Sequence, residues 1–211
     1  MTKRFLVVSF PLLFEKGQIG KLTTKNRLVM PPMGTNLAEE DGEVTDALIR
    51  YYEERALGGV GTVVVEIAGV DPGGKAIRRQ IGLWDDKFVA GLSKLAAAIK
   101  NGGAVAVIQL HHAGRQTATV ITGSQPVAPS PIPCPVNQET PKELTVPEIT
   151  GLVTAFGEAA RRAMQAGFDA VELHGTHGYL INQFLSSYSN KINTVDRSIT
   201  GFASLLKSST P

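Results

Sequence analysis

The stretch ALIRYYEERALGGVGTVVVEI, residues 47 to 67, decides the fold class of this chain. Its first part has the apolar spacing of an amphipathic helix, which we expect Asp46 to cap and paired glycines to end. Its second part, VGTVVVEI (60 to 67), is a short apolar run of the kind that forms a strand buried on both faces. A helix that leads directly into a buried strand is typical of α/β proteins with a parallel sheet.

The same alternation continues on both sides of this stretch. Three more buried strands are predicted, at RLVMPPM (27 to 33), AVAVIQL (104 to 110) and DAVELHG (169 to 175). Two more helices are predicted, KFVAGLSKLAAAIKNGG, opened by Asp85 and Asp86, and PEITGLVTAFGEAARRAMQAG, with Pro147 in its first turn. Short connections between strands and helices predict βα units, in either a doubly wound sheet or a (β/α)8 barrel.

Two segments depart from the alternation. Before the first strand, LLFEKGQIGKLTTKNRL predicts a small hairpin around residues 17 to 20, suited to plugging the bottom of a barrel. Residues 111 to 146 form a long connection rich in proline and polar residues. A connection of this length inside a compact domain is usually functional.

Composition narrows the function classes. The 211 residues favour one domain, and the net charge of +2, from 21 basic and 19 acidic residues, gives no reason to expect nucleic acid or an anionic membrane as partner. Cys134 is the only cysteine, so no internal disulfide or cysteine-rich metal cluster is possible, which fits a reducing cytoplasm. MTKRFLVVSFPLLF has the look of a secretory signal, but Pro11 interrupts it and no cleavage site follows. We therefore expect a cytoplasmic protein without a membrane span.

Common nucleotide and hydrolase motifs are missing or misplaced. The glycines of GGVGTV (58 to 63) have a suggestive spacing, but they end a helix and precede a strand. A dinucleotide fingerprint requires the opposite order, so these glycines are interpreted as a helix cap. The sequence contains neither a Walker-type loop nor a serine-elbow pattern.

The carboxyl ends of the predicted strands carry the candidate site, because ligands of parallel α/β folds lie there. The residues at these ends are Pro31 to Thr35, Glu66 and Ile67, Gln109 with His111 and His112, and His174 with His177 and Tyr179. Together they offer a flat apolar surface, one amide and several neutral donors. This chemistry suits a planar heterocycle with polar edges better than a phosphoester or a peptide.

The pair His174 and His177 has three interpretations. One histidine can simply bond a loop carbonyl, as isolated histidines often do. The pair could also bind a metal together with Glu172 or Glu66, although spacing fixes no third ligand. Lastly, both imidazoles could donate N–H groups to one substrate oxygen, with Tyr179 as a nearby proton donor.

Five motifs, in order, carry a family resemblance: LFEKGQIGKLTTKNRLVMPPMGT, VVVEIAGVDPGGKAIRRQIGLWDD, VIQLHHAGRQ, VAPSPIP and ELHGTHGYLINQFLSSYSN. Over residues 12 to 191 the chain resembles the old yellow enzyme family of FMN-dependent NAD(P)H oxidoreductases, nearest to its bacterial ene-reductase and dienoyl-CoA reductase branches. The resemblance implies a (β/α)8 TIM barrel. Here it covers the first four βα units with the amino-terminal hairpin.

The resemblance also implies roles for individual residues. Those expected to touch the FMN ring are Pro32, Met33, Gly34, Ile67 and Gln109, with Gln109 on the pyrimidine edge. His174 and His177 would bind the oxygen of an activating carbonyl, and Tyr179 would protonate the alkene carbon. NADH or NADPH would reduce FMN, and an α,β-unsaturated carbonyl compound would then take the hydride.

The chain departs from this family in three places. Gly34 stands where many members carry Thr or Cys, and Ile67 where a small residue is usual. After SSYSNK the sequence reads INTVDRSITGFASLLKSSTP, which has no counterpart to the family's later strands. We therefore expect an extension over 1 to 11, half a barrel over 12 to 191 and an unrelated tail over 192 to 211.

Half a barrel has consequences for function. Unpaired sheet edges favour self-association, and FMN would lose the contacts of its phosphate. The hypothesis is that this chain binds FMN weakly or not at all. The alternatives are a catalytically inactive half-barrel fragment and a metal-dependent barrel enzyme.

Overall fold

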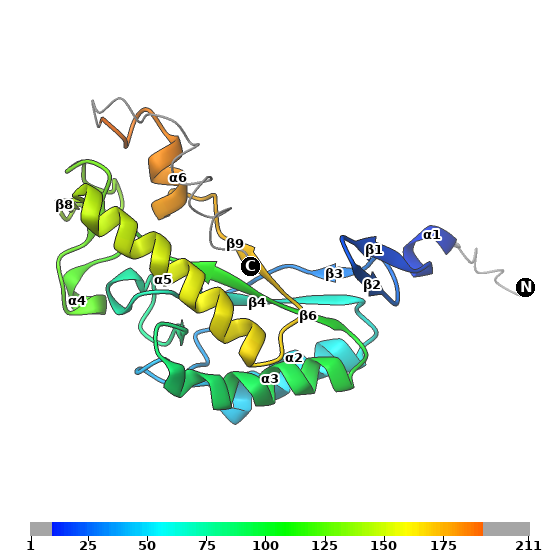
Figure 1. The fold of residues 1–211 in the computed structure, drawn as a ribbon. Helices are drawn as coiled ribbons and strands as arrows, with labels where there is room; N and C mark the ends of the chain where they lie inside the picture. The colour runs from blue at the N-terminus through cyan, green and yellow to red at the C-terminus, as the bar shows by residue number, and fades with distance from the viewer. Residues whose placement is uncertain (1–9, 192–211) are drawn as a thin grey trace, which may run out of the picture.

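A curved parallel sheet forms the centre of the molecule (Figure 1). The computed structural model describes residues 10–191. The sheet contains β3 (Val29–Met30), β4 (Thr62–Gly69), β6 (Val105–His111) and β9 (Ala170–Leu173), side by side in that order. A further short strand, β5 (Ile81–Gly82), pairs with the end of β4. The strand order follows the chain without reversal, as in a (β/α)8 barrel, whereas a doubly wound sheet reverses its order at a switch point.

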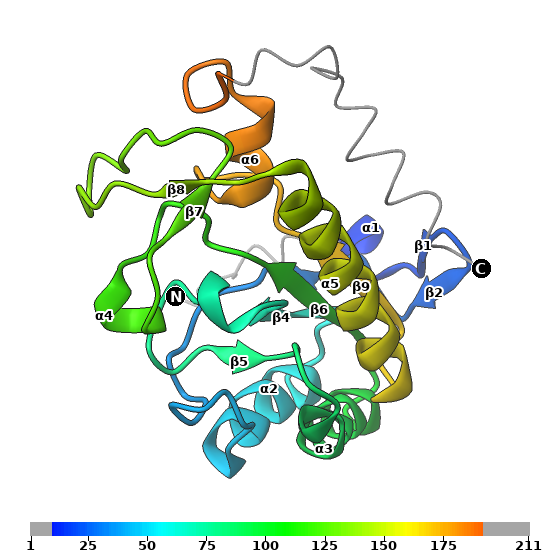
Figure 2. The same ribbon diagram turned by 60° about the vertical axis from the view of Figure 1, so that its left-hand side comes forward.

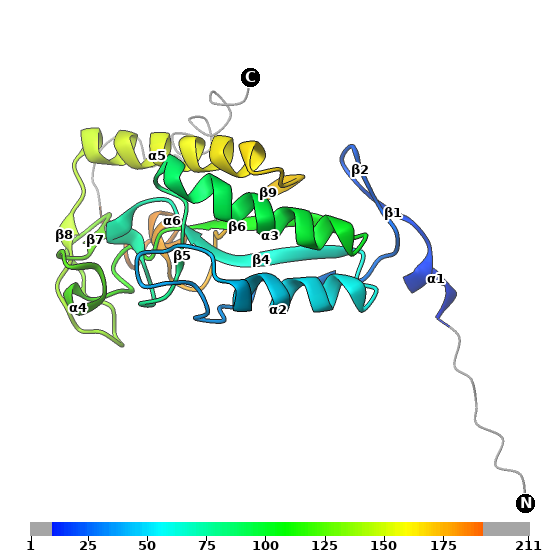
Figure 3. The same ribbon diagram turned by 90° about the horizontal axis from the view of Figure 1, so that it is seen from below.

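Three long helices cover one face of this sheet (Figures 2 and 3). They are α2 (Asp46–Leu57), α3 (Val89–Asn101) and α5 (Val146–Gln165). Their apolar faces and the outward side chains of β4 and β6 form one core, which includes Leu48, Leu92, Leu95, Ile99 and Phe156. The strands β3, β4 and β6 are thus each followed by a helix that packs against the sheet, which confirms the predicted βα alternation.

The helix starts differ slightly from the expected ones. Thr45, not Asp46, caps α2, because its hydroxyl oxygen accepts a hydrogen bond from the Leu48 N–H at 3.1 Å. Asp85 caps a short 3₁₀ turn, η2 (Asp86–Phe88), and α3 begins only at Val89. The prediction for α5 is confirmed, since Pro147 lies in its first turn.

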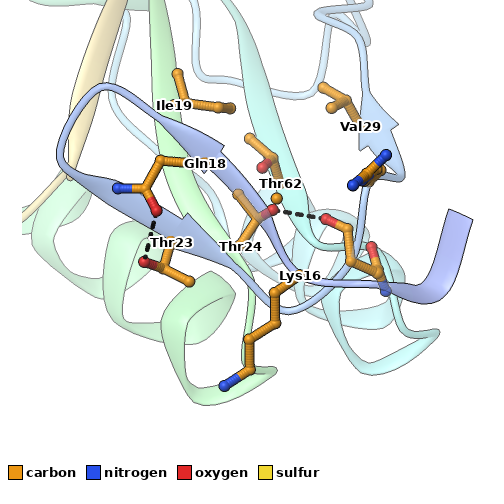
Figure 4. Close-up of a pocket in the computed structure, with 10 residues that line it drawn as sticks. Lys16, Gln18, Ile19, Thr23, Thr24, Val29 and Thr62 are labelled. Atoms are coloured by element: carbon orange, nitrogen blue, oxygen red, sulfur yellow. Dashed lines mark hydrogen bonds between the residues drawn. The ribbon is translucent and has the colours of Figure 1, made fainter. Parts of the chain in front are cut away.

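The predicted hairpin is present at the amino-terminal end of the sheet. It follows α1 (Pro11–Phe14) and consists of β1 (Gly17–Ile19) paired antiparallel with β2 (Leu22–Thr24). A hollow of about 670 Å³ lies between the hairpin and the first residues of β3 and β4 (Figure 4). Its lining includes Lys16, Thr23, Thr24, Val29 and Thr62. The hollow is therefore at the end of the strands opposite to the candidate site.

The long connection over residues 111 to 146 folds into short elements of its own. It contains α4 (Thr119–Thr122) and the paired strands β7 (Val127–Ala128) and β8 (Lys142–Glu143). Arg115, which is buried, ties the segment together by donating to the carbonyl oxygens of Ile132 and Pro133 at 3.0 and 3.2 Å. The last helix, α6 (Leu180–Leu185), lies near this excursion (Figure 2).

A β-bulge interrupts the pairing of β4 with β6. Val65 pairs with Ile108, but the next partner of Gln109 is Ile67, so Glu66 is an extra residue on β4. Because side chains alternate along a strand, the extra residue changes which face the following residues occupy. Glu66 faces α2, where Tyr52 donates to its carboxylate at 3.1 Å. Ile67 joins the inner face of the sheet, opposite to the helices.

The described helices differ from membrane-spanning helices in length or hydropathy. Within residues 10–191, none of them combines the length and the apolar character that a membrane crossing requires. The expected extension over 1 to 11 falls mostly outside the described residues. The expected tail over 192 to 211 lies outside them entirely.

Candidate functional site

A row of side chains crosses the inner face of the sheet near the carboxyl ends of its strands. Ile67 on β4 is in register with Gln109 on β6, which is in register with Glu172 on β9. The Gln109 amide donates to the Glu172 carboxylate at 2.6 Å, which holds the amide in one orientation. Gln109 is buried, and Ile67 and Glu172 are half-buried. A ligand on the inner face of the sheet would therefore meet an apolar side chain, an amide and a carboxylate.

Four aromatic rings lie close together beyond this row, at the ends of β6 and β9. His111 follows Gln109 by two residues on β6, so it points to the same face. Its ring centre lies 4.3 Å from that of Tyr179 and 5.6 Å from that of His174. His174 in turn lies 5.3 Å from His177 and 4.8 Å from Tyr179. The three predicted catalytic residues therefore form one cluster, which also includes His111.

The loop from residue 174 to 179 orients this cluster. The Thr176 N–H donates to Nδ1 of His174 at 3.5 Å, and the Thr176 hydroxyl lies 3.1 Å from Nδ1 of His177. His177 has a φ of 57°, in the left-handed region that most side chains avoid. The Leu180 N–H, which follows Tyr179, donates to the His112 carbonyl at 3.0 Å and anchors the loop on the end of β6. Because Nδ1 of His174 accepts from a backbone N–H, the proton of its neutral ring lies on Nε2, which can act as a donor.

Burial keeps several of these histidines neutral. It lowers the pKa of His174, with a smaller contribution from His177 nearby, and it lowers the pKa of His111 well below the usual range. The pKa of His112, behind the cluster, falls to about 4 through burial, although the Asp71 carboxylate 3.9 Å away acts in the opposite direction. Neutral imidazoles at these positions are N–H donors without a net charge.

The depressed pKa of His112 predicts a pH-dependent stability. The unfolded chain takes up a proton near the ordinary histidine value of about 6.5, and the folded chain does so only near 4. Stability is therefore fully present above about pH 7 and falls as the pH drops through this window. We expect a loss of about 2 kcal/mol from this residue between pH 7 and pH 5, measured by urea denaturation.

The variant His112→Gln provides the control for this prediction. Glutamine keeps a polar side chain but does not titrate, so the difference in unfolding free energy between pH 7 and pH 5 should shrink by about the same 2 kcal/mol. A wild-type chain equally stable at both pH values would contradict the prediction.

The loop after β3 supplies the flat surface. Met33 is 60% exposed, Gly34 is exposed, and Pro32 is half-buried. The loop is fixed at Thr35, whose N–H donates to the Glu66 carboxylate at 3.0 Å. Burial raises the pKa of Glu66, and its second oxygen has no hydrogen-bond partner. Glu66 therefore holds the loop and α2 together and does not face the imidazole cluster.

The described residues do not provide a set of ligands for the metal ion that the sequence left open. Among residues 10–191, no three side chains of His, Cys, Asp or Glu type lie close enough to hold a metal ion. Glu66, one of the two carboxylates considered for this role, is bonded to Tyr52 and Thr35 on the other side of the sheet. The other, Glu172, accepts from Gln109.

Sequence reasoning missed two residues of the site. The sequence predicts for His111 only a place at a strand end, and it predicts no role for Gln80. Gln80 is fully buried, and its amide nitrogen lies 3.3 Å from Nδ1 of His111. The period-two spacing from Gln109 to His111 was the available signal for His111. No local pattern in the loop before β5 marks Gln80.

The strand order and this cluster define the class: the described residues form part of a (β/α)8 barrel, with the candidate site at the carboxyl ends of its strands. The chain belongs to the NADH:flavin oxidoreductase / NADH oxidase family, whose model matches residues 12–196. The match confirms the resemblance seen in the sequence motifs.

Two relatives illustrate the similarity in sequence. The chain is 53% identical over 184 residues to an NADH oxidase of Thermoanaerobacter brockii, covering 86% of this chain and 28% of that protein. It is 45% identical over 178 residues to an NADPH dehydrogenase of Clostridium acetobutylicum, covering 84% of this chain and 52% of that one. The chain thus spans about half or less of the length of these relatives.

Solved structures agree with this picture. An old yellow enzyme homologue from Zymomonas mobilis matches with a TM-score of 0.85 and 30% identity, over 95% of this chain and 59% of that one. A 2-naphthoyl-CoA reductase in complex with 2-naphthoyl-CoA matches with a TM-score of 0.87 and 32% identity, over 92% of this chain and 32% of that one. The described fold is therefore the amino-terminal part of this barrel.

Proposed function

We propose that this chain provides the ring-binding and substrate-activating half of an FMN-dependent NAD(P)H oxidoreductase of the ene-reductase type. Its substrates would be α,β-unsaturated carbonyl compounds, whose C=C bond is reduced. Membership of the family implies FMN as cofactor and NADH or NADPH as reductant. The observation that carries the finer proposal is the cluster of His174, His177 and Tyr179 beside the row that contains Gln109.

The residues present fit the isoalloxazine ring of FMN. Gln109 offers a fixed amide for a polar ring edge, and the exposed Met33 and Gly34 offer a flat apolar surface. The pyrimidine-edge and ring contacts would therefore come from Pro32, Met33, Gly34, Ile67 and Gln109. The chemistry that bound FMN would supply is the transfer of a hydride from NADH or NADPH to the substrate.

The protein's own groups would then polarise the substrate. N–H groups of His174 and His177 would bind the carbonyl oxygen, which draws electron density from the alkene and stabilises the negative charge that develops. Both imidazoles are oriented beforehand by Thr176, so little reorganisation is needed during the reaction. Tyr179, 4.8 Å from His174 between ring centres, would deliver a proton to the alkene carbon that does not take the hydride.

The first experiment is to purify the 211-residue chain with added FMN and record the visible spectrum after gel filtration. A retained flavin band that NADH or NADPH bleaches under anaerobic conditions, with turnover of a simple enone, supports the proposal. A colourless protein supports the rival interpretation of an inactive half barrel, which would bind FMN weakly or not at all. Stoichiometric bound flavin would reject that rival.

Self-association is a related proposal for the isolated chain. Both edges of the sheet are open in the described residues: Val29 on β3 is 52% exposed and Leu173 on β9 is 39% exposed. An open strand edge carries unpaired backbone groups that a second copy of the chain can cover. Light scattering during the same gel filtration should therefore give a mass of at least twice the 22.5 kDa of one chain. A monomer would contradict this.

A substitution at Gly34 tests the placement of the ring. A Cβ atom at this position would meet only Ile77 Cδ1, at an ordinary 3.8 Å, so a threonine fits without strain. Its hydroxyl would add one hydrogen bond to the flavin, worth about 0.5–1.5 kcal/mol. We expect Gly34→Thr to raise the midpoint potential of bound FMN by about 10–30 mV, measured by spectroelectrochemistry. An unchanged or lower potential would count against this position.

A further inference from the structure

His111 is a buried polar residue that the proposed mechanism leaves without a role. Its side chain is fully buried, and its Nε2 atom has no hydrogen-bond partner. A buried polar atom without a partner costs free energy, so such an atom calls for an explanation. His111 also contacts both His174 and Tyr179, the latter at 4.3 Å between ring centres with the rings nearly perpendicular.

The neighbouring amide determines where the proton of His111 sits. The Gln80 Oε1 atom accepts a hydrogen bond from the Ala76 N–H at 2.7 Å, so the amide oxygen is committed to the backbone. The other end of the amide, Nε2, therefore faces Nδ1 of His111 at 3.3 Å as a donor. Nδ1 must then be the acceptor, and the proton of the neutral ring lies on Nε2. Burial, which lowers the pKa of His111, keeps the ring in this neutral form.

This fixes an N–H donor without a partner on a ring that is in edge contact with the ring of Tyr179, the proton donor of the proposed reaction. Tyr179 is left with a phenolate oxygen once it has given its proton to the substrate. A half-buried phenolate is stabilised by a donor, and hydrogen bonds to charged groups are about twice as strong as those between neutral groups. The geometry points to His111 as a positioning residue for Tyr179: Gln80 holds it as the Nε2–H tautomer, and this N–H stabilises the deprotonated Tyr179 oxygen. The inference rests on the proposed role of Tyr179.

The first test determines which ring nitrogen of His111 carries the proton. It requires neither FMN nor turnover. The chain contains four histidines, so ¹⁵N-histidine labelling gives a small spectrum that single substitutions can assign. At pH 7 we expect His111 to carry its proton on Nε2 in the 211-residue chain. In Gln80→Met, which removes the donor to Nδ1, a population with the proton on Nδ1 should become visible. A proton on Nδ1 in the wild type, or an unchanged tautomer in Gln80→Met, would overturn the inference.

The second test reads the charge on Tyr179. Tetranitromethane nitrates tyrosine through its phenolate form, and mass spectrometry of peptides reports each residue separately. The exposed Tyr188 serves as an internal reference. We expect the nitration of Tyr179 relative to Tyr188 to fall about 10- to 100-fold in His111→Phe, which keeps the ring contact but lacks the N–H group.

The two tests separate this inference from the proposed function. An unchanged nitration ratio in both His111→Phe and Gln80→Met would overturn the role of His111, whatever the enzyme does. Absence of enone reduction in the FMN-bound wild type would overturn the proposed function while leaving both readouts intact. Gln80→Met provides a second variant if His111→Phe does not fold, since its substitution lies outside the ring cluster.

Discussion

Replacement of Tyr179 by phenylalanine is expected to lower the rate of alkene reduction by about 10²- to 10⁴-fold in the FMN-bound protein. General acid catalysis by a positioned side chain contributes a factor of this size. Phenylalanine keeps the ring contacts with His111 and His174, at 4.3 and 4.8 Å between centres, so the cluster should stay in place. Rapid-mixing kinetics would measure the oxidation of reduced flavin by an enone such as 2-cyclohexenone.

Two comparisons make this result specific. The reduction of flavin by NADPH or NADH involves no proton from Tyr179, so its rate should change less than threefold in Tyr179→Phe. Tyr188→Phe is the matched control, because Tyr188 is 61% exposed and lies outside the ring cluster. A loss below tenfold in Tyr179→Phe, or an equal loss in both half-reactions, would reject Tyr179 as the proton donor.

The second large effect is expected at His174. Replacement by phenylalanine removes a preorganised N–H donor to the substrate oxygen, and the loss of one such donor costs about 10²–10³ in rate. His174→Asn should recover much of this loss, since its amide also donates an N–H group. The measurement is kcat for enone reduction together with the binding of a phenol, whose oxygen would occupy the same position.

The activities of His174→Phe and His174→Asn distinguish the effect of the N–H group from the effect of the ring shape. If only the ring shape of His174 mattered, phenylalanine would be tolerated better than asparagine. If the N–H group matters, the order is reversed and binding of the phenol weakens in the phenylalanine variant. Equal activity of both variants at the wild-type level would reject His174 as a donor to the substrate.

Much of the fold could be predicted from the sequence because its strands are short apolar runs between clear helix ends. The runs around β4 and β6 became strands close to the expected bounds. The first run was predicted over seven residues, yet β3 spans only Val29–Met30, because the two prolines that follow cannot donate to a sheet ladder. Helix starts were misplaced at Thr45 and Val89, where several capping residues compete within a few positions.

Most residues of the candidate site could be predicted from the sequence, but the contacts between them could not. Side chains alternate along a strand, so Gln109 and His111 lie on the same face. This can be predicted once the strand itself is predicted. The contact of Gln80 with His111 joins residues 31 positions apart in sequence through a loop that follows no periodicity. The bulge at Glu66 could not be predicted either, because the apolar pattern of VVVEI is the same whether or not one residue is left out of the strand pairing.

The bulge in β4 also determines what the deletion of one residue from this strand would do. Loss of the single codon for Glu66 would restore regular pairing and leave Val65 on the helix side and Ile67 on the inner face, as they are now. The deletion would remove, however, the carboxylate that accepts from Tyr52 and from the Thr35 N–H, and with it the link between α2 and the loop after β3. Loss of one exposed residue such as Val136 from the excursion over 111 to 146 would only shorten a loop. An in-frame deletion scan of the gene should therefore be far less tolerant at residue 66 than in that excursion.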